Sequence, residues 1–317
     1  MTIQILDEQQ ILKNIKSQKN PYFNDYYAFY SSWFGGIVKD PSMMLLPIDD
    51  HMVHRGDGVF EAMKAVAKSV YLMDEHLRRL FKSAEKIGLK STFDFSQVKE
   101  IILETLRAVN QNDAMIRVFL SRGPGNFSVN PYDSVGSQLY VVVTKLNSLS
   151  LEKYKNGVVI GKSDIPVKDS WIAQIKSCNY LPNVLMKKEA VDRHLDFVIC
   201  IDEQNHITES ATENIMIVDQ HEMIIHPTLD YILQGTTMIR ACELARENGI
   251  TTLVRPISIN DLLNAREVMI TGTTVNVLPV VKFEQDTIGN GKPGPITMKL
   301  NELIHNDMKT GGHRTTF

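Results

Sequence analysis

The stretch Ile175-Lys176-Ser177-Cys178-Asn179-Tyr180-Leu181-Pro182-Asn183-Val184-Leu185 is the part of this 317-residue chain from which its fold can be argued. A strand-like run and a loop (Ile165 to Trp171) precede it, and a helical pattern begins near Asn183. Lys176 is therefore expected where a strand gives way to a helix, a position from which a side chain can point into a cleft. Taken alone this lysine indicates little, because most lysines are solvated surface charges.

Other segments carry residue types that could act together with Lys176. They are His76-Leu77-Arg78-Arg79-Leu80, Ile207-Thr208-Glu209, Gln234-Gly235-Thr236-Thr237 and Thr271-Gly272-Thr273-Thr274. Between them they offer an arginine, a carboxylate and two turns rich in hydroxyl groups and backbone N–H donors. These are the groups needed to hold a phosphorylated pyridine aldehyde against a lysine.

The composition is that of an ordinary globular protein. Apolar residues make up 43% and charged residues 22%, and 34 basic against 37 acidic residues give a net charge of −3. This balance argues against a dedicated nucleic-acid surface. The N-terminus lacks the pattern of a secretion signal, and no apolar stretch reaches the roughly 18 residues that a membrane span requires. The three cysteines have neither metal nor disulfide spacing, which fits a reducing compartment. We therefore expect a cytoplasmic protein that binds neither nucleic acid nor membrane.

No metal site is expected. His51 and His54 have a metal-like i,i+3 spacing, but no further pair of ligands follows nearby.

The length favours two domains. Residues 1–25 form a polar extension and residues 26–145 a small α/β domain, while 146–155 is a polar linker without strong periodicity. Residues 156–317 form the larger domain, which we expect to bind the cofactor. Strands and helices mix without strict βαβ alternation, and this favours a mixed α/β (α+β) fold.

Periodicity predicts the main helices and the ends of the chain. Helices are expected at 4–15, 75–89, 97–109, 184–194, 238–248 and 296–308. A threonine after Gly235 is expected to cap the helix at 238–248. The tail after Lys309 is expected to be frayed.

A pyridoxal phosphate site has four physical requirements. A lysine must form an imine with the aldehyde and then carry protons, and a carboxylate must face the ring nitrogen. An arginine and the N–H groups of a helix start must hold the phosphate, and a donor must lie near the phenolate oxygen. The chain offers Lys176, Glu209, Arg79, the helix start at Gly235, Thr236 and Thr237, the further donor Thr273, and Tyr180 as the candidate for the phenolate oxygen. Each also has an ordinary structural interpretation, but those interpretations do not explain the whole set.

These segments resemble those of the class IV (fold type IV) pyridoxal-phosphate enzymes, in the family's order and over nearly the whole chain, from about Tyr30 to Met308. The family includes D-amino-acid aminotransferases, branched-chain aminotransferases and aminodeoxychorismate lyases. The resemblance implies a two-domain fold of the D-amino-acid aminotransferase type and a homodimer. It makes Lys176 the Schiff-base lysine, Arg79 the phosphate arginine and Glu209 the partner of the pyridine nitrogen. The two phosphate-binding turns fall on Gly235-Thr236-Thr237 and on Thr273.

Within the family the chain is most similar to the plant-type D-amino-acid aminotransferases, in Pro47 to Phe60, in Gly123-Pro124-Gly125 and in Lys176 to Leu185. The resemblance implies a transaminase that takes an amino group from a D-amino acid. Two alternatives stay open: a 4-amino-4-deoxychorismate lyase and a branched-chain L-amino-acid aminotransferase. The chain lacks the extra glycine that branched-chain enzymes carry between lysine and asparagine. It also lacks the carboxylate-binding trio of the bacterial D-amino-acid enzymes between residues 123 and 131.

The substrate carboxylate still requires a cation. Arg55, Arg117 and Arg122 are the candidates. Arg117 is predicted on a strand, which positions a side chain better than a loop does, and Arg55 is predicted in a loop that could face the cofactor. We expect one of these two to bind the substrate.

Overall fold

The computed structural model describes residues 3–317, so the first two residues of the expected extension lie outside the described residues. The chain forms two compact units. Unit 1 comprises the chain up to Val70, Leu80–Leu146 and Thr316–Phe317, and unit 2 comprises Tyr71–Arg79 and Asn147–Thr315. These units are sets of residues that contact one another more than they contact the rest of the chain. They do not test the domain boundaries expected from the sequence, which remain a prediction.

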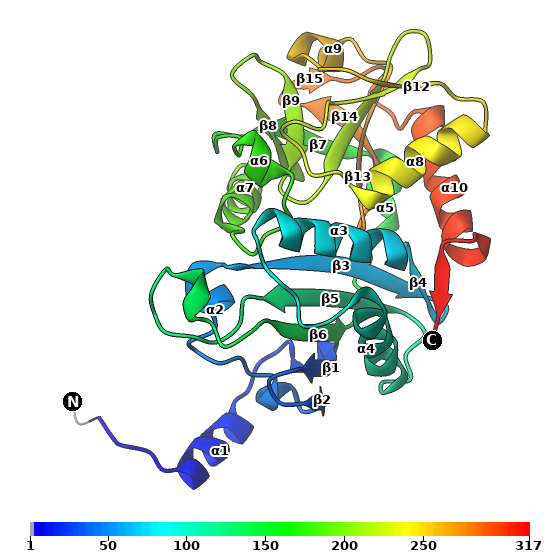
Figure 1. Ribbon diagram of the computed structural model, residues 1–317. Helices are drawn as coiled ribbons and strands as arrows, with labels where there is room; N and C mark the ends of the chain where they lie inside the picture. Colours follow the sequence, from blue (N-terminus) through cyan, green and yellow to red (C-terminus); the bar gives the residue numbers. More distant parts are fainter. Residues whose placement is uncertain (1–2) are drawn as a thin grey trace. The chain divides into compact units, whose positions relative to one another are not determined.

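Unit 1 is built on antiparallel strands that follow one another in the order β4, β3, β5, β6, β1 and β2 (Figure 1). These are β1 (Tyr26–Ser31), β2 (Gly36–Val38), β3 (Gly58–Val66), β4 (Ser69–Tyr71), β5 (Ala114–Ser121) and β6 (Gln138–Thr144). The helices are α1 (Glu8–Ser17), α2 (His51–Arg55) and α4 (Phe95–Arg107), while α3 (Met73–Lys86) begins in unit 2 and ends in unit 1.

Helix α4 shows how local sequence positions an element of unit 1. Asp94 caps its first turn, and the Asp94 and Gln97 side chains form a reciprocal capping box. The helix therefore begins two residues before the expected start at 97. Its buried face contains Val98 and Ile102, as the periodicity predicted, and it packs against β6 and β1.

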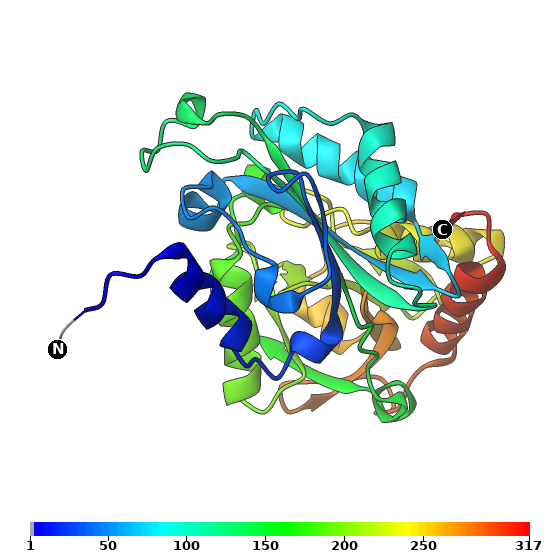
Figure 2. The ribbon, with the colours of Figure 1, turned by 90° about the horizontal axis from the view of Figure 1, so that it is seen from below.

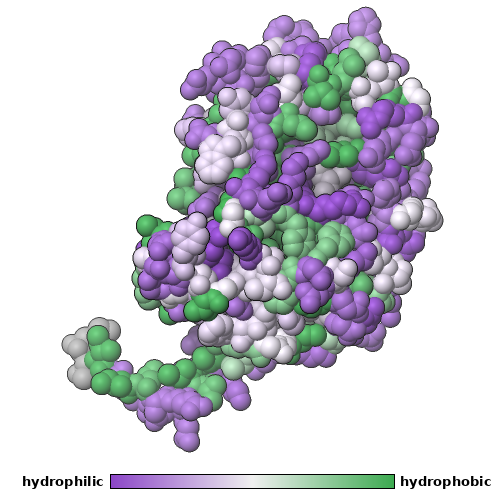
Figure 3. All heavy atoms as spheres, in the orientation of Figure 1, coloured by the Kyte–Doolittle hydropathy of each residue, from purple (hydrophilic) through white to green (hydrophobic). Residues whose placement is uncertain are grey.

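Helix α1 is capped in the same way but is hardly packed. Asp7 and Gln10 form its capping box, so it begins at Glu8 and not at residue 4 as expected. None of its residues is buried. Figure 2 shows α1 as a dark-blue helix that follows an extended segment. Apolar side chains gather along that segment in Figure 3, where Ile3 is 86% and Ile5 94% exposed.

Unit 2 is built on a mixed sheet with the strand order β12-β11-β10-β13-β14-β7-β8-β9, and β15 pairs with β14. Its strands are β7 (Val158–Lys162), β8 (Phe197–Ile201), β9 (Ile207–Ser210), β10 (Asn214–Val218), β11 (Ile224–His226), β12 (Thr252–Val254), β13 (Glu267–Gly272), β14 (Asn276–Phe283) and β15 (Asp286–Thr287). The helices are α5 (Leu151–Asn156), α6 (Ser170–Ala173), α7 (Leu181–Asp192), α8 (Thr236–Glu247), α9 (Ile259–Leu263) and α10 (Pro295–Thr310).

The sheet of unit 2 closes on itself. Strand β9 pairs with β8 on one side and, through Glu209 opposite Asn214, with β10 on the other. Strands β10, β13, β14, β7, β8 and β9 therefore form a continuous ring, filled by an apolar core that includes Ile160, Ile215 and Leu278. The closing pair places Glu209 where β9 and β10 meet.

Two expectations about elements of unit 2 were wrong. Helix α8 begins at Thr236 with Gly235 as its N-cap, and no side chain caps it, so no threonine has that role. Helix α5 overlaps the residues expected as a linker, 146–155, and that linker stays a prediction. The tail after Lys309 is not frayed, since it ends in the short strand β16 (Arg314–Thr316).

Candidate active site

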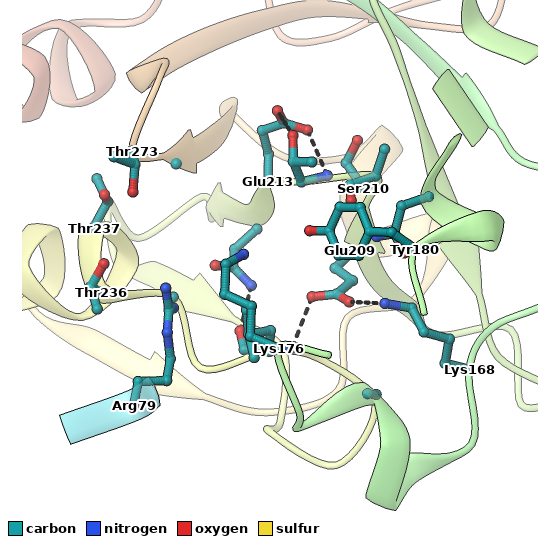
Figure 4. Close-up of a pocket in the computed structure, with 18 of the residues that line it drawn as sticks. Arg79, Lys168, Lys176, Tyr180, Glu209, Ser210, Glu213, Thr236, Thr237 and Thr273 are labelled. Carbon is teal, nitrogen blue, oxygen red and sulfur yellow. Dashed lines mark hydrogen bonds and ion pairs between the residues drawn. The ribbon is translucent and has the colours of Figure 1, made fainter. Parts of the chain in front are cut away.

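A pocket of unit 2 brings together the residues predicted for the cofactor site. It is lined by Arg79 of α3, Lys176 and Tyr180 from the segment before α7, Glu209 of β9, Gly235, Thr236 and Thr237 at the start of α8, and Thr273 after β13 (Figure 4). These residues are up to 194 positions apart by their numbers, 79 and 273, and one pocket collects all of them. The sequence placed them in separate segments, and the fold brings the segments together.

Lys176 lies in the short connection between α6 and α7. Its side chain is buried, with a residue exposure of 9%, and its Nζ lies 5.8 Å from the centroid of the Tyr180 ring. Pro182 in the first turn lets α7 begin at Leu181, three residues before the expected start, because a proline costs no hydrogen bond there. The lysine is therefore held just ahead of a helix start, as predicted, but the short helix α6, which was not expected, lies between β7 and the lysine.

Glu209 has partners on both carboxylate oxygens. The backbone N–H of Leu233 donates to Oε2 at 2.8 Å, and Lys168 Nζ lies 3.6 Å from Oε1. Burial raises the pKa of Glu209, while the nearby Lys168 charge, the Leu233 N–H and the Lys176 charge act in the opposite direction. Lys168 was not among the predicted site residues, since no local pattern sets it apart from other lysines.

The start of α8 is suited to an anion. Its first-turn N–H groups have no side-chain cap, and such groups attract negative charge at a helix N-terminus. Arg79 Nη1 donates to the carbonyl of Gln234 at 2.9 Å, directly before this turn. A Cβ at Gly235 would collide with Asn214 Oδ1, so any larger residue here would force the Asn214 side chain or the helix start to move.

His76 connects the two anion-binding elements and was missed by the sequence analysis. Its Nδ1 lies 3.4 Å from Arg79 Nη2, and its Nε2 lies 3.2 Å from Thr236 Oγ1. The histidine is buried on the same helix as Arg79, three residues earlier. It was quoted within its segment, and only its neighbours in space reveal this contact.

Two further pocket residues follow Glu209 along the chain. The Oγ of Ser210 is buried and has no hydrogen-bond partner within residues 3–317. Glu213 is buried and accepts hydrogen bonds from the backbone N–H of Thr212, at 3.1 Å, and from its hydroxyl. A buried hydroxyl without a partner leaves a donor and acceptor free toward the pocket.

The predicted substrate arginines belong to unit 1 and do not line this pocket. Arg55 donates to the carbonyls of His54 and Phe127, at 2.9 Å and 2.6 Å. Arg117 is exposed on β5, with Nη1 3.3 Å from Thr144 Oγ1. Their role remains a prediction.

The third candidate, Arg122, is already paired with groups of the protein itself. Its Nε and Nη2 each contact one Asp57 oxygen at 2.9 Å, and its Nη1 and Nη2 donate to the backbone carbonyls of residues 88 and 87. A bidentate pair of this kind leaves little capacity for a substrate.

No metal centre competes with this interpretation. Within the part of the chain that the structure describes, no group of three or more histidine, cysteine, aspartate or glutamate side chains could hold a metal ion. The donor set instead fits a phosphorylated, ring-shaped cofactor. It offers cationic and N–H groups at one end, a carboxylate at the other and an amine in between.

The sequence matches the family model "Amino-transferase class IV" over residues 58–283. The chain belongs to the class IV aminotransferases. Members of this family use pyridoxal 5'-phosphate, so the group that the pocket fits is the family's cofactor. The identification from the quoted segments is thereby confirmed, as is the fold class.

Curated relatives of the class IV chain include enzymes with different substrates. It is 35% identical over 292 residues to "D-amino-acid transaminase, chloroplastic" of Arabidopsis thaliana, covering 90% of this chain and 78% of the relative. It is 30% identical to "D-alanine aminotransferase" of Bacillus licheniformis, covering 87% and 96%. It is also 30% identical to the "Putative branched-chain-amino-acid aminotransferase" of Methanocaldococcus jannaschii, covering 88% and 96%.

Solved structures show the same fold. A branched-chain amino acid aminotransferase crystallised with pyridoxamine 5'-phosphate aligns with a TM-score of 0.86 at 23% identity, over 92% of this chain and 98% of that one. A 4-amino-4-deoxychorismate lyase of Pseudomonas aeruginosa aligns with a TM-score of 0.75 at 20% identity, over 84% and 96%. In residues 3–317, no helix has the length and apolar character needed to cross a membrane.

Proposed function

We propose that this protein is a pyridoxal-phosphate transaminase that moves an amino group from a D-amino acid to a 2-oxo acid. The observation that carries the proposal is one pocket in which Lys176 lies with Glu209, Arg79 and the uncapped start of α8. Those are an amine, a partner for a ring nitrogen and a seat for a phosphate.

The residues of the chain divide the work. Arg79, the N–H groups at the start of α8 and Thr273 would bind the phosphate, and Glu209 would accept the ring N–H. When bound, pyridoxal phosphate supplies an aldehyde that condenses with amines and a ring that withdraws electron density from the substrate. Lys176 Nζ would hold the cofactor and, once the substrate amine replaces it, carry the proton from the substrate α-carbon. Tyr180 would donate to the phenolate oxygen.

The D-amino-acid assignment is supported by two curated relatives with D-amino-acid substrates in their names, at 35% and 30% identity. The branched-chain alternative is supported by a relative at 30% identity. The lyase alternative is supported only by a likeness of fold. In the proposed reaction, Arg55 or Arg117 would bind the substrate carboxylate. The predicted cytoplasmic location is retained as part of the proposal.

The first experiment is a single-turnover absorbance measurement on the enzyme with pyridoxal phosphate bound. The enzyme is mixed separately with D-alanine, L-leucine and aminodeoxychorismate while the visible band of the cofactor is followed. Loss of the band with D-alanine, with pyruvate formed, is the expected result. Loss with L-leucine alone would assign the protein to the branched-chain group. Pyruvate and 4-aminobenzoate from the third substrate, with the band restored, would make it a lyase. Failure to bind pyridoxal phosphate would overturn the proposal.

We also propose that the protein is a homodimer. Helix α7 exposes several apolar side chains, with Leu181 67%, Val184 58% and Val191 58% exposed, and the exposed Lys188 lies between the two valines on the same face. Apolar side chains exposed together on a helix are typical of a protein–protein interface. Light scattering during size-exclusion chromatography should give twice the monomer mass, 35.9 kDa. A monomer at micromolar concentration would contradict this part of the proposal.

A further inference from the structure

The pocket contains a second lysine whose role the proposed reaction leaves open. Lys168 lies in the loop between β7 and α6, eight residues before Lys176. Its side chain is 20% exposed, less than most lysine side chains. Its Nζ lies 3.6 Å from Glu209 Oε1 and 5.9 Å from the centroid of the Tyr180 ring.

We propose that Lys168 is a positioning residue that keeps the Glu209 carboxylate ionised and aimed into the pocket, so that a proton is retained on the ring nitrogen of the cofactor. This inference rests on the proposed function and assigns it a residue outside the predicted set. Lys168 itself does not touch the reacting atoms; it acts through Glu209.

The geometry separates the two lysines. In Figure 4 the Lys168 side chain points at Glu209 from the side opposite Lys176, and Lys176 lies between Glu209 and Arg79. Lys168 Nζ forms an ion pair with Oε1, and the Leu233 N–H donates a hydrogen bond to Oε2, so the two groups hold different oxygens of the carboxylate. Each oxygen has a further lone pair, which leaves an acceptor for a ring N–H.

The positive charge of Lys168 is needed to keep Glu209 ionised, because Glu209 is buried. Its side chain is 13% exposed, and burial favours the neutral acid, raising the pKa of Glu209. Among the groups that oppose this effect of burial, Lys168 is the largest, ahead of the Leu233 N–H and Lys176. A neutral carboxylic acid in this position would accept a ring N–H poorly, and the ring would then lose its proton more easily.

The other titratable groups near Glu209 do not replace Lys168. They are Lys176, Tyr180 and Cys200. Burial, together with the Glu209 charge, raises the pKa of the Cys200 thiol to about 11, so at neutral pH it carries no charge. In the proposed reaction the Lys176 amine bonds to the cofactor, and Lys176 opposes the effect of burial on the Glu209 pKa less than Lys168 does. Of the two lysines, Lys168 therefore has the larger influence on Glu209.

The test compares Lys168→Met, which keeps length and removes charge, with Lys168→Arg, which keeps charge. Lys162→Met, at an exposed position of β7, is the matched control. The first readout is the ¹⁵N chemical shift of the ring nitrogen in enzyme loaded with ¹⁵N-labelled pyridoxal phosphate. We expect Lys168→Met to move this shift toward the unprotonated pyridine value at a pH at which the wild type stays protonated. Lys168→Arg and Lys162→Met should keep the wild-type shift.

The second readout needs no cofactor: the unfolding midpoint of the ligand-free protein between pH 4 and 8. When folding raises the pKa of a carboxyl group, the folded protein loses stability as the pH rises from the pKa of that group in the unfolded state through its pKa in the folded state. Lys168→Met should widen this window, so that its midpoint falls further below that of Lys162→Met as pH rises, with little difference at pH 4. The kcat of the loaded enzyme should fall about tenfold, which corresponds to a decrease of about one unit in the pKa of the ring nitrogen. The KM should change little.

Unchanged ring protonation together with an unchanged pH profile in Lys168→Met would overturn the inference. If Lys168→Met does not fold, Lys168→Gln makes the same comparison. A wild-type protein that binds no pyridoxal phosphate would instead contradict the proposed function, and the ligand-free pH profile would still decide whether Lys168 controls Glu209.

Discussion

At the scale of single residues, the pocket contains ionisable side chains that are buried, although burial disfavours their charged forms. Lys176 is buried, with 9% of its surface exposed, and Glu209 is largely buried beside it. Keeping charged groups away from water is costly unless partners compensate, and buried ionisable groups gathered in one pocket are typical of functional sites. The amine and the carboxylate therefore carry the sharpest predictions.

Replacement of Lys176 by alanine should abolish turnover, because Lys176 supplies the amine that lies between Glu209 and Arg79 in the pocket (Figure 4). Mass spectrometry after borohydride reduction should find the phosphopyridoxyl group on the peptide containing Lys176 in the wild type and on no peptide of the variant. Lys188→Ala, on the exposed face of α7, is the control and should retain both properties. Normal turnover by Lys176→Ala would make the whole site assignment wrong.

Replacement of Glu209 by glutamine should leave the cofactor bound but slow the proton transfers by roughly 10²-fold, because a neutral amide does not hold the proton on the ring nitrogen. Stopped-flow measurement of the half-reaction with an amino donor checks this. Glu203→Gln, in the exposed turn before β9, is the control. Equal rates for the two variants would remove Glu209 from its ring-nitrogen role.

At the scale of elements, the phosphate seat depends on how α8 begins. Gly235 is its N-cap, and the absence of a side-chain cap leaves the first-turn N–H groups for a ligand. The side chain of Asn214 occupies the place that a Cβ at Gly235 would need, and it is fixed there by a 2.8 Å hydrogen bond to the carbonyl of Leu233. The start of α8 therefore packs directly against the β9–β10 junction through Asn214.

Gly235→Ala should displace either Asn214 or the first turn of α8, and so weaken cofactor binding by at least tenfold while the protein remains folded. Equilibrium dialysis against pyridoxal phosphate measures the affinity, and circular dichroism measures the fold. Gly312→Ala, where a Cβ meets nothing within 4 Å, is the control. An unchanged affinity in Gly235→Ala would show that this approach does not matter for binding.

At the scale of the whole molecule, a buried ion pair joins helices α8 and α10 in unit 2. Two nitrogens of Arg240 contact both oxygens of Asp307 at 2.9 Å, and the Tyr71 hydroxyl donates to Asp307 at 2.6 Å. Burial alone would raise the pKa of Asp307, but the hydrogen bonds from Arg240 and Tyr71 outweigh burial and lower it. This pair secures the helix that carries the phosphate seat.

Asp307→Asn should lower the free energy of unfolding at pH 7 by about 3 kcal/mol, because Arg240 is left buried without its full partner. A carboxyl whose pKa is lowered by folding contributes stability above its unfolded pKa, and this stability is lost as pH falls through the folded pKa. The difference from the wild type in urea unfolding should therefore shrink below about pH 4. Asp286→Asn, exposed on β15, should show no difference at either pH.

The sequence by itself determined the family, the cofactor and the separate chemical parts of the site. The segments that hold Lys176, Glu209, Arg79 and Gly235 resemble those of the class IV family, and helix α4 follows its own periodicity and cap. Such features depend on residues within a few positions of one another, so they can be recognised from the sequence without a structure.

Only the tertiary structure decided which residues meet. Lys168 reaches Glu209 across 41 positions by their numbers, 168 and 209, and His76 reaches Thr236 from another helix. The N-cap of α8 is a glycine because Asn214 occupies the adjacent space, which no local pattern around residue 235 records. These contacts follow from the closure of β9 onto β10 and from the packing of α8, and packing between distant segments leaves no periodic signal in the chain.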